Sequence, residues 1–403
     1  MSENDNHNLS PTLIAILSIA VGITVANLYY AQPIISMISK SIGLRPELSG
    51  LVVTLTQAGY GLGVFFIIPL GDIVESKKLI LSMIAMTIVS LLGLAYVTSL
   101  YPYFLAALLT GLGASAVQIL VPYAAHFSSD LKRGQVIGTL MSGLMIGIML
   151  SRPISSILTA MFNWHAVFVL SAVLMLMIGC ILYYFLPPKE PTVKDLHYKD
   201  LIKSMAHLYM NTELLRRRAI YQAFLFGSFC LFWTASPMHL TGAPFHLSQT
   251  AIAIFALVGV AGAVSSPFAG KAADRGHSQK ATLIAMISCS IAFLLGNIIP
   301  GNSVFALAAL VIAAILLDAG ITANLVLGQR AIFQLPAQYR SRLNGLYIAT
   351  IFIGGATGSA LGGWAYATGG WALTSWVGFA MPVLALIYFL TEKSTSPAES
   401  RFN

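Results

Sequence analysis

The sequence has very few charged residues. Only 9% of its 403 residues are Asp, Glu, Lys or Arg, whereas hydrophobic residues make up 57%. A soluble globular chain carries roughly 25% charged residues, so this chain cannot cover a water-facing surface of ordinary polarity. The scarcity excludes a soluble enzyme, a disordered chain and a fibrous protein. It predicts a polytopic membrane protein that contacts the lipid bilayer.

Signatures of catalysis and metal binding are also missing. The three cysteines, Cys180, Cys230 and Cys289, lie inside apolar runs without CxxC spacing, so neither a disulfide framework nor a metal site is implied. The sequence has no Walker loop, GxSxG, HExxH or zinc pattern. Its polar loops are too short for an ATPase domain. We therefore expect no enzymatic activity, no metal and no cofactor, and any transport would be secondary.

Long apolar runs fill most of the chain. The first ten residues lack Lys and Arg, so they do not resemble a secretory signal, and Ser10-Pro11 is a plausible helix start. A spanning helix needs about 20 mostly apolar residues, whereas a membrane strand is half that length and alternates in polarity. The expected fold is an all-α polytopic protein with twelve transmembrane helices. They are predicted at 12–38, 48–70, 79–98, 101–125, 135–160, 164–186, 219–240, 250–270, 281–299, 303–329, 343–366 and 370–391.

The basic residues are concentrated on one side of these predicted helices. With a cytoplasmic N-terminus, 19 of the 22 Lys and Arg fall in cytoplasmic loops and the tail, and only Lys40 and Arg45 lie opposite. Both termini are therefore predicted to be cytoplasmic. Short basic clusters between apolar runs do not indicate a nucleic-acid partner, despite the net charge of +8. The bias fits a bacterial inner membrane.

The chain divides into two similar parts. The polar stretch 187–218 is predicted to be a cytoplasmic linker with a short interfacial helix near 201–208, joining six-helix bundles at 1–186 and 219–403. At an offset of 207 residues, the basic stretch that begins at Arg133 matches the one that begins at Arg340. The same offset relates three small residues of helix 5 to three of helix 11. These matches indicate an internal repeat.

This duplicated six-helix unit resembles the major facilitator superfamily over nearly the whole chain. The family's loop between helices 2 and 3 reads G-x-x-x-D-R-x-G-R-R, and the second half resembles it at Gly270, Asp274, Arg275, Gly276 and Lys280. The first half keeps Asp72 and Lys78, but Ile68 and Ile73 replace the glycine and the arginine. The resemblance implies two pseudo-symmetric bundles that work as a monomer by alternating access.

Helix 5 resembles the antiporter motif of that family. Gly138, Gly143 and Gly147 precede Pro153, but Arg152 replaces the usual glycine before the proline. The segment 27–33, Asn-Leu-Tyr-Tyr-Ala-Gln-Pro, is similar to that of a bacterial group near the drug:proton antiporters. The resemblance implies efflux coupled to protons.

Two functions are weighed for the recurring loop and glycine positions. Asp72, Lys78, Asp274, Arg275 and Lys280 could form a cytoplasmic gate, or only fix the topology. Small residues at every fourth position let helices approach closely in lipid. They could form a moving contact with the opposite half or a static one. In helices 5 and 11 these positions include Gly143, Gly147, Gly354, Gly358 and Gly362.

Arg152 and Asp318 are charged residues inside predicted spans. An intramembrane charge normally faces a cavity or a partner. Arg152, in the outer half of helix 5, could bind an anionic substrate group or a carboxylate from another helix. Asp318, near the middle of helix 10, could take up a proton or could be a buried hydrogen-bonded residue. Further candidates for the substrate path are Asn27, Tyr30, Gln32, Gln57, Gln118, Tyr221, Gln222, Trp233 and Asn324.

The favoured interpretation is a secondary transporter that exports a small organic compound, a drug or a metabolite, in exchange for protons. The alternative is a facilitator or proton symporter of sugars or organic anions with the same fold. Asp318 and the partial antiporter motif favour the first, whereas Arg152 suits an anionic group. A membrane enzyme would need a cluster of catalytic groups, and a receptor would usually add a soluble domain.

Overall fold

The computed structural model describes residues 9–191, 197–298, 303–336 and 339–392, in which helices are the only regular secondary structure. The side chain of Asp130 is also outside this description. The first half contains α1 (Pro11–Ala26), α2 (Ile35–Ser41), α3 (Leu51–Phe66), α4 (Ser76–Tyr96), α5 (Leu100–Ala114), α6 (Val117–His126), α7 (Asp130–Met161) and α8 (Trp164–Phe185). After α9 (Tyr198–Asn211) come α10 (Glu213–Thr241), α11 (Gln249–Ala256), α12 (Val260–Asp274), α13 (Ser278–Ile298), α14 (Val304–Phe333) and α15 (Arg340–Leu390).

The helices account for twelve crossings of a membrane. In the described residues, ten helical segments are long and apolar enough to cross, and α1 is a shorter apolar helix. Helix α15 contains two crossings, because the backbone leaves helical geometry at Gly369 and Gly370. Gly370 has φ 61°, a conformation that costs glycine little because it lacks a Cβ. The all-α, twelve-helix prediction is therefore confirmed.

Two of the predicted helices are interrupted. The run 12–38 is not one helix, because α1 ends at Ala26 and is followed by a turn, the short helix η1 (Gln32–Ile34) and α2. Pro33 has no backbone N–H to donate, which explains a break here. The run 250–270 is likewise divided into α11, η4 (Leu257–Gly259) and α12. Both interruptions lie beside the central charged site described below.

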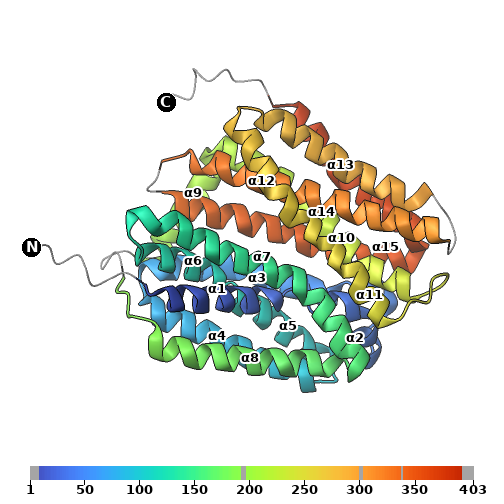
Figure 1. Ribbon diagram of the computed structural model, residues 1–403, viewed down its shortest axis with the longest axis horizontal. Helices are drawn as coiled ribbons and strands as arrows, with labels where there is room; N and C mark the ends of the chain where they lie inside the picture. The colour runs from blue at the N-terminus through green and yellow to red at the C-terminus, as the bar shows by residue number, and fades with distance from the viewer. Residues whose placement is uncertain (1–8, 192–196, 299–302, 337–338, 393–403) are drawn as a thin grey trace, which may run out of the picture.

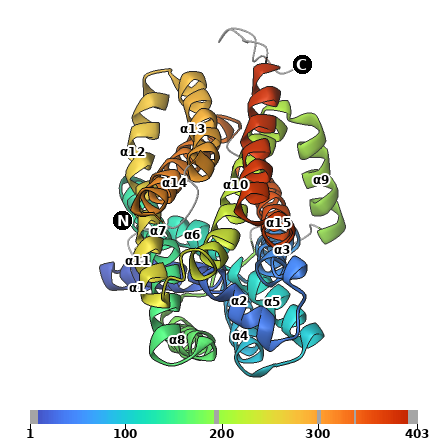
Figure 2. The same cartoon turned by 90° about the vertical axis from the view of Figure 1, so that its right-hand side faces the viewer.

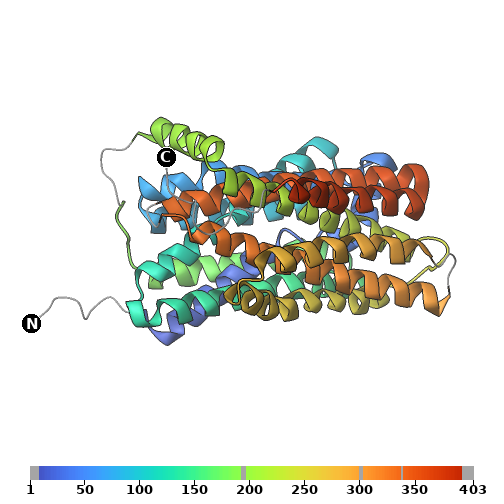
Figure 3. The ribbon, with the colours of Figure 1, turned by 90° about the horizontal axis from the view of Figure 1, so that it is seen from above.

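The two halves of the chain lie side by side along their length. Figure 1 shows the blue-to-green helices of the first half below the yellow-to-red helices of the second. Helix α7 packs against α1, and α10 against α15, within one half. Between halves, α3 packs on α15 and α7 packs on α11. In Figure 3 the long helices of the two halves run in roughly the same direction.

The small residues of the helix 5 and helix 11 motifs make contacts within their own halves. A Cβ at Gly143 would lie 2.2 Å from the carbonyl oxygen of Ser18 in α1, and Gly147 is as close to Gly22. A Cβ at Gly358 would lie 1.9 Å from the Gly227 carbonyl oxygen in α10; the contact partners of Gly354 and Gly362 are Ala223 and Leu231. Of the two alternatives for these glycines, the contacts favour packing within one half over a moving contact with the opposite half.

The close approach between halves is made by other glycines. A Cβ at Gly363 in α15 would lie 2.3 Å from the backbone nitrogen of Gly50, at the start of α3. A Cβ at Gly50 would lie 2.1 Å from the Ser359 carbonyl oxygen. Backbones this close leave no room for a side chain at these positions unless the halves move apart.

The predicted linker contains a helix, α9, at the edge of the bundle (Figure 2). It is longer than the expected 201–208, and its buried Leu201 and Met205 face the bundle. The Tyr198 hydroxyl donates to the carbonyl oxygen of Phe66 (2.7 Å), and Arg342 donates to the Ser204 hydroxyl (3.2 Å). Helix α9 thus joins the two halves. Helix α10 begins at Glu213, inside the segment predicted as linker.

Candidate functional site

Arg152 lies at the centre of the interface between the halves. Helix α7 continues through Arg152 and Pro153 and places the arginine side chain, only 2% exposed, beside η1. Its Nε donates to Gln32 Oε1 at 2.7 Å. Its guanidinium carbon lies 4.3 Å from the ring centre of Trp233, 5.1 Å from Phe229 and 5.2 Å from Tyr29. Two of these rings belong to α10, so a charge of the first half is held largely by aromatic faces of the second.

Asp318 approaches the same place from the other half. It lies in the middle of α14 and is 4% exposed. Its Oδ1 accepts a hydrogen bond from the indole nitrogen of Trp233 at 3.0 Å. Trp233 therefore contacts both charges, with its ring face toward Arg152 and its N–H toward Asp318.

The two charges face each other beside Gly259. A Cβ on Gly259 would lie 3.1 Å from Asp318 Oδ2 and 3.6 Å from Arg152 Nη1. Arg152 and Asp318 attract each other electrostatically, and they do not form one of the ion pairs found among the described residues. A Cβ at this end of η4 would press on the carboxylate, so glycine fits here without displacing it. The structure thus brings together four predicted residues, Gln32, Arg152, Trp233 and Asp318.

Several other predicted cavity residues instead connect helices within one half. The Ser171 hydroxyl of α8 donates to Asn27 Oδ1 at 2.5 Å and is also bonded to Tyr30. Asn324 donates to Gln222 Oε1 at 2.7 Å, and Gln222 donates to the carbonyl oxygen of Ile321. These bonds lie inside the first and second halves respectively. They indicate helix packing more directly than substrate contact.

A second polar group lies where α3 meets α15. Gln118 Nε2 donates to the Tyr60 hydroxyl at 3.0 Å, and the Tyr60 ring lies 4.2 Å from Phe352 of the opposite half. Gln57, one turn before Tyr60, is fully buried, and both atoms of its amide lack a partner among the residues the structure describes. Buried amides are almost always hydrogen-bonded, so Gln57 is a candidate for bonding a water or a ligand.

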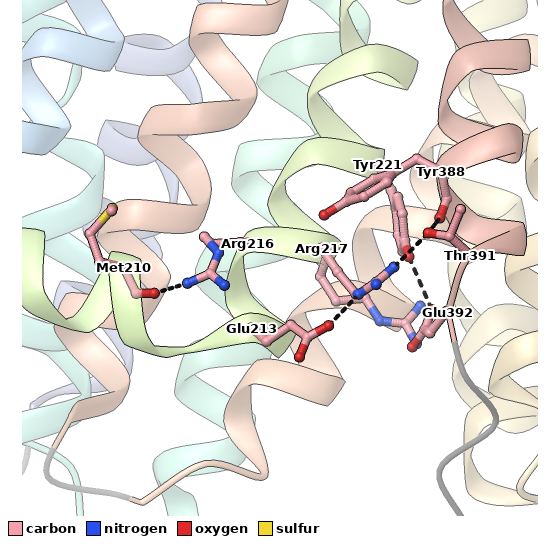
Figure 4. Close-up of polar contacts among 9 residues, drawn as sticks. Met210, Glu213, Arg216, Arg217, Tyr221, Tyr388, Thr391 and Glu392 are labelled. Carbon is pink, nitrogen blue, oxygen red and sulfur yellow. Dashed lines mark hydrogen bonds and ion pairs between the residues drawn. The ribbon is translucent and has the colours of Figure 1, made fainter.

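Tyr221 lies away from this centre, at the end of the second half. Its hydroxyl donates to Glu392 at 3.1 Å, and Arg217 bonds Glu213 and Thr391 (Figure 4). Arg218 also approaches Glu392, at 3.6 Å. Tyr221 was expected on the substrate path, but it fastens the start of α10 to the end of α15. Its depth in the membrane could not be predicted, because α10 begins at Glu213, before the span predicted at 219–240.

The residues of the two loop motifs differ in what they face. Asp72 lies in a small cavity with Arg342 of α15 and Met205 of α9, and it attracts both Arg342 and Lys189. Burial lowers the pKa of the Lys189 ammonium, and the Asp72 carboxylate opposes that shift. Asp72 therefore faces charge from the opposite half, as a gate residue would.

The repeat-related Asp274 forms an ion pair with Arg330 of its own half. Arg275 and Lys280 are exposed, and Lys78 pairs with nearby Glu75 at 2.7 Å. The duplicated motif thus reaches across the halves at Asp72 and stays within one half at Asp274.

Sequence reasoning missed three residues of the central site. Tyr29 and Phe229 form two faces around Arg152, and Gly259 separates it from Asp318. Tyr29 lies three positions before Gln32, and Phe229 one helical turn before Trp233. That spacing from predicted residues was the available signal.

The Major Facilitator Superfamily matches this chain at residues 17–332 and 231–403. The chain belongs to this family and is a multi-pass membrane transport protein. It is 36% identical, over 95% of its length and 96% of the relative, to the uncharacterized transporter YgaY of Escherichia coli O157:H7. It is 28% identical to the probable transporter SCO4007 of Streptomyces coelicolor, over 89% of this chain and 82% of that one.

Solved transporters share the fold. A crystal structure of the peptide transporter POT in complex with alafosfalin superposes with a TM-score of 0.76 at 16% identity, covering 94% of both chains. A crystal structure of the nucleoside transporter NupG has a TM-score of 0.71 at 15% identity, covering 94% of this chain and 99% of that one. These likenesses establish the architecture.

Proposed function

We propose that this transporter exports a small organic compound, a drug or a metabolite, in exchange for protons by alternating access. The observation that carries the proposal is the position of Asp318, buried between the halves and facing Arg152 past Gly259. A buried carboxylate can alternate between a charged and a protonated form when its counter-charge moves. A pair split between the halves changes its separation whenever the halves move.

None of the groups that face Asp318 competes with it as a proton carrier. Arg152 of α7 is a permanent cation, and Trp233 of α10 supplies a neutral N–H. Tyr29 of the first half and Cys289 of α13 also interact with it electrostatically, and Cys230 interacts with Arg152. Tyrosine and cysteine do not normally release protons at neutral pH. Asp318 alone among these groups can exchange a proton under such conditions.

The topology completes the proposal. The halves, 1–186 and 219–403, would act as two bundles that rock about the central site, with 187–218 as cytoplasmic linker. Both termini would face the cytoplasm of a bacterium, with the protein in the inner membrane and the proton gradient as energy source. The partners would be the substrate, protons and lipid, and the protein would function as a monomer.

Transport in proteoliposomes with an imposed pH gradient tests the proposal. A panel of lipophilic cations, sugars, organic acids and zwitterions would be offered to the parent, Asp318→Asn and Arg152→Ala. Glu47→Gln, which changes an exposed carboxylate in the short helix η2 (Pro46–Leu48), is the matched control. We expect gradient-driven transport in the parent and the control and its loss in Asp318→Asn. Gradient-independent transport in all four proteins would refute proton coupling and leave a facilitator.

A further inference from the structure

The central site contains buried donors that have no acceptor. Gln32 Oε1 is used by Arg152 Nε, but Gln32 Nε2 and Arg152 Nη2 have no hydrogen-bond partner in the described ranges. Gln32 is fully buried and Arg152 nearly so. Buried polar groups are almost always satisfied, and an unsatisfied charged donor is especially costly. Two such donors on neighbouring side chains fit an anionic oxygen group such as a carboxylate.

The acceptor on the opposite side is the Asp318 carboxylate. Its Oδ1 receives the Trp233 N–H at 3.0 Å, and its Oδ2 faces Gly259. An ionised carboxylate can accept about four hydrogen bonds, so it can also bind a cationic donor such as an ammonium group. A Cβ on Gly259 would lie 3.1 Å from Oδ2 and 3.6 Å from Arg152 Nη1, so the carboxylate and the guanidinium lie near each other.

Aromatic rings surround these polar atoms. Trp233, Phe229 and Tyr29 all lie within 5.2 Å of the Arg152 guanidinium carbon, measured to the ring centres. Phe255 continues this surface beside Trp233. The surface offers an apolar substituent a dry, rigid contact.

We infer that the substrate is a compact zwitterion with an apolar side group, of the α-amino-acid kind. Its carboxylate would bind Arg152 and Gln32 of the first half, and its ammonium would bind Asp318 of the second. Bound in this way, the carboxylate would pair with the Arg152 charge and the ammonium would pair with the Asp318 charge, so the occupied site would be neutral overall. A substrate with only a positive charge would lie close to Arg152 and would leave the guanidinium without a carboxylate. A substrate with only a negative charge would lie close to the ionised Asp318 carboxylate. Both arrangements bury charge without compensation and are unfavourable. This inference rests on the proposed function, since it names the substrate class of the same site.

Competition at Asp318 would link substrate binding to protons. A proton on Asp318 and an ammonium group compete for the same carboxylate, so the site holds one or the other. Zwitterion binding should therefore weaken on acidification. Tyrosine, cysteine and arginine side chains do not normally change protonation near neutral pH, so Tyr29, Cys230, Cys289 and Arg152 should not reverse the sign.

Thermal unfolding of the detergent-purified full chain tests the inference without any gradient. The probes are L-phenylalanine and L-leucine, each with its amide, which is cationic, and its N-acetyl derivative, which is anionic. We expect the free amino acids to raise the unfolding midpoint and both derivatives to bind at least about tenfold more weakly, since each removes one charge-assisted contact. Equal binding of a derivative, or no shift with any probe, would overturn the inference.

Variants then distinguish recognition from general damage. Arg152→Gln should prefer the amide and Asp318→Asn the N-acetyl derivative, because each leaves a single charge to be matched. The double variant keeps the site neutral and should fold but lose both preferences. A ranking unchanged in the single variants would contradict the assignment. Proton coupling fails separately: zwitterion binding with gradient-independent transport would refute the proposed exchange and leave the substrate class intact.

Discussion

Two buried arginines of this transporter have their opposite charges in different places. Arg218 is 7% exposed; it donates to the Thr282 hydroxyl at 3.2 Å and forms an ion pair with Glu392 at 3.6 Å, both in the second half. Arg152 is 2% exposed, but its counter-charge, Asp318, belongs to the opposite half. The first arrangement persists when the halves move as units, whereas the second must change. Arg218 therefore stabilises one bundle, whereas the attraction between Arg152 and Asp318 depends on how the two bundles are positioned.

The same distinction recurs in the glycines and the loop aspartates. Gly358 packs within the second half, whereas Gly363 packs against Gly50 of the first. Asp274 pairs within its half, whereas Asp72 faces Arg342 of the other. Internal sequence repeats therefore do not imply equal roles, because the repeated positions meet different neighbours.

The largest effect is expected from breaking the pair that crosses the halves. Arg152→Gln or Asp318→Asn leaves a buried charge without the opposite charge that attracts it, which should cost about 3 kcal/mol of unfolding free energy. The double variant should recover most of that loss but none of the gradient-driven transport. Denaturant unfolding in detergent, combined with the proteoliposome assay, measures both. Losses that simply add in the double variant would show that the two residues do not interact.

A smaller loss of a different kind is expected at the pair within the second half. Glu392→Gln removes the carboxylate that Arg218 and Tyr221 share, and should cost about 2–3 kcal/mol of unfolding free energy. Because both partners move together, transport per folded molecule should stay near the parent value. Tyr221→Phe is the milder companion variant. A specific transport defect in either, with stability unchanged, would place this cluster in the transport cycle instead.

The fold could be predicted from the sequence because each helix carries its own evidence. About 20 consecutive apolar residues define a crossing whatever its neighbours are, and basic loops separate one crossing from the next. The interruption at Pro33 was missed by the prediction of one helix at 12–38, although proline lacks the N–H that a helix needs. The break before Val260 was missed as well, because Gly259 matters through its contacts with Asp318 and Arg152.

The site could be predicted only residue by residue. A charge inside a span indicates a partner, which singled out Arg152 and Asp318, but no local pattern shows that α7 and α14 bring them to one place. Asn27 and Gln222 have the same polar character as Gln32, yet they bond the uncharged Ser171 and Asn324, whereas Gln32 bonds Arg152. Which face of a helix points to the opposite half depends on packing between distant segments, and the sequence does not state it.

The glycines sharpen the comparison at intermediate size. Gly358→Ala forces a Cβ against the Gly227 carbonyl within one half and should cost about 2 kcal/mol of unfolding free energy. Gly363→Ala presses on Gly50 across the halves, which can separate to relieve it. It should lower stability less and alter the transport rate more. Thermal unfolding and initial transport rates of the two variants decide the matter, and equal effects on both readouts would remove the distinction.

The smallest effects are expected at the loop aspartates. Asp274 and Arg330 are both exposed, so Asp274→Asn should cost less than about 1 kcal/mol and leave transport nearly unchanged. Asp72 is half-buried between Arg342 and Lys189, so Asp72→Asn should change the transport rate while barely altering the unfolding midpoint. Arg342→Gln, which removes the charge on the other half, should change the transport rate as much as Asp72→Asn does. The double variant should show no further change in rate. If Asp274→Asn changed the rate as much as Asp72→Asn, the two loop motifs would act as equal gates, and contact across the halves would not be what matters.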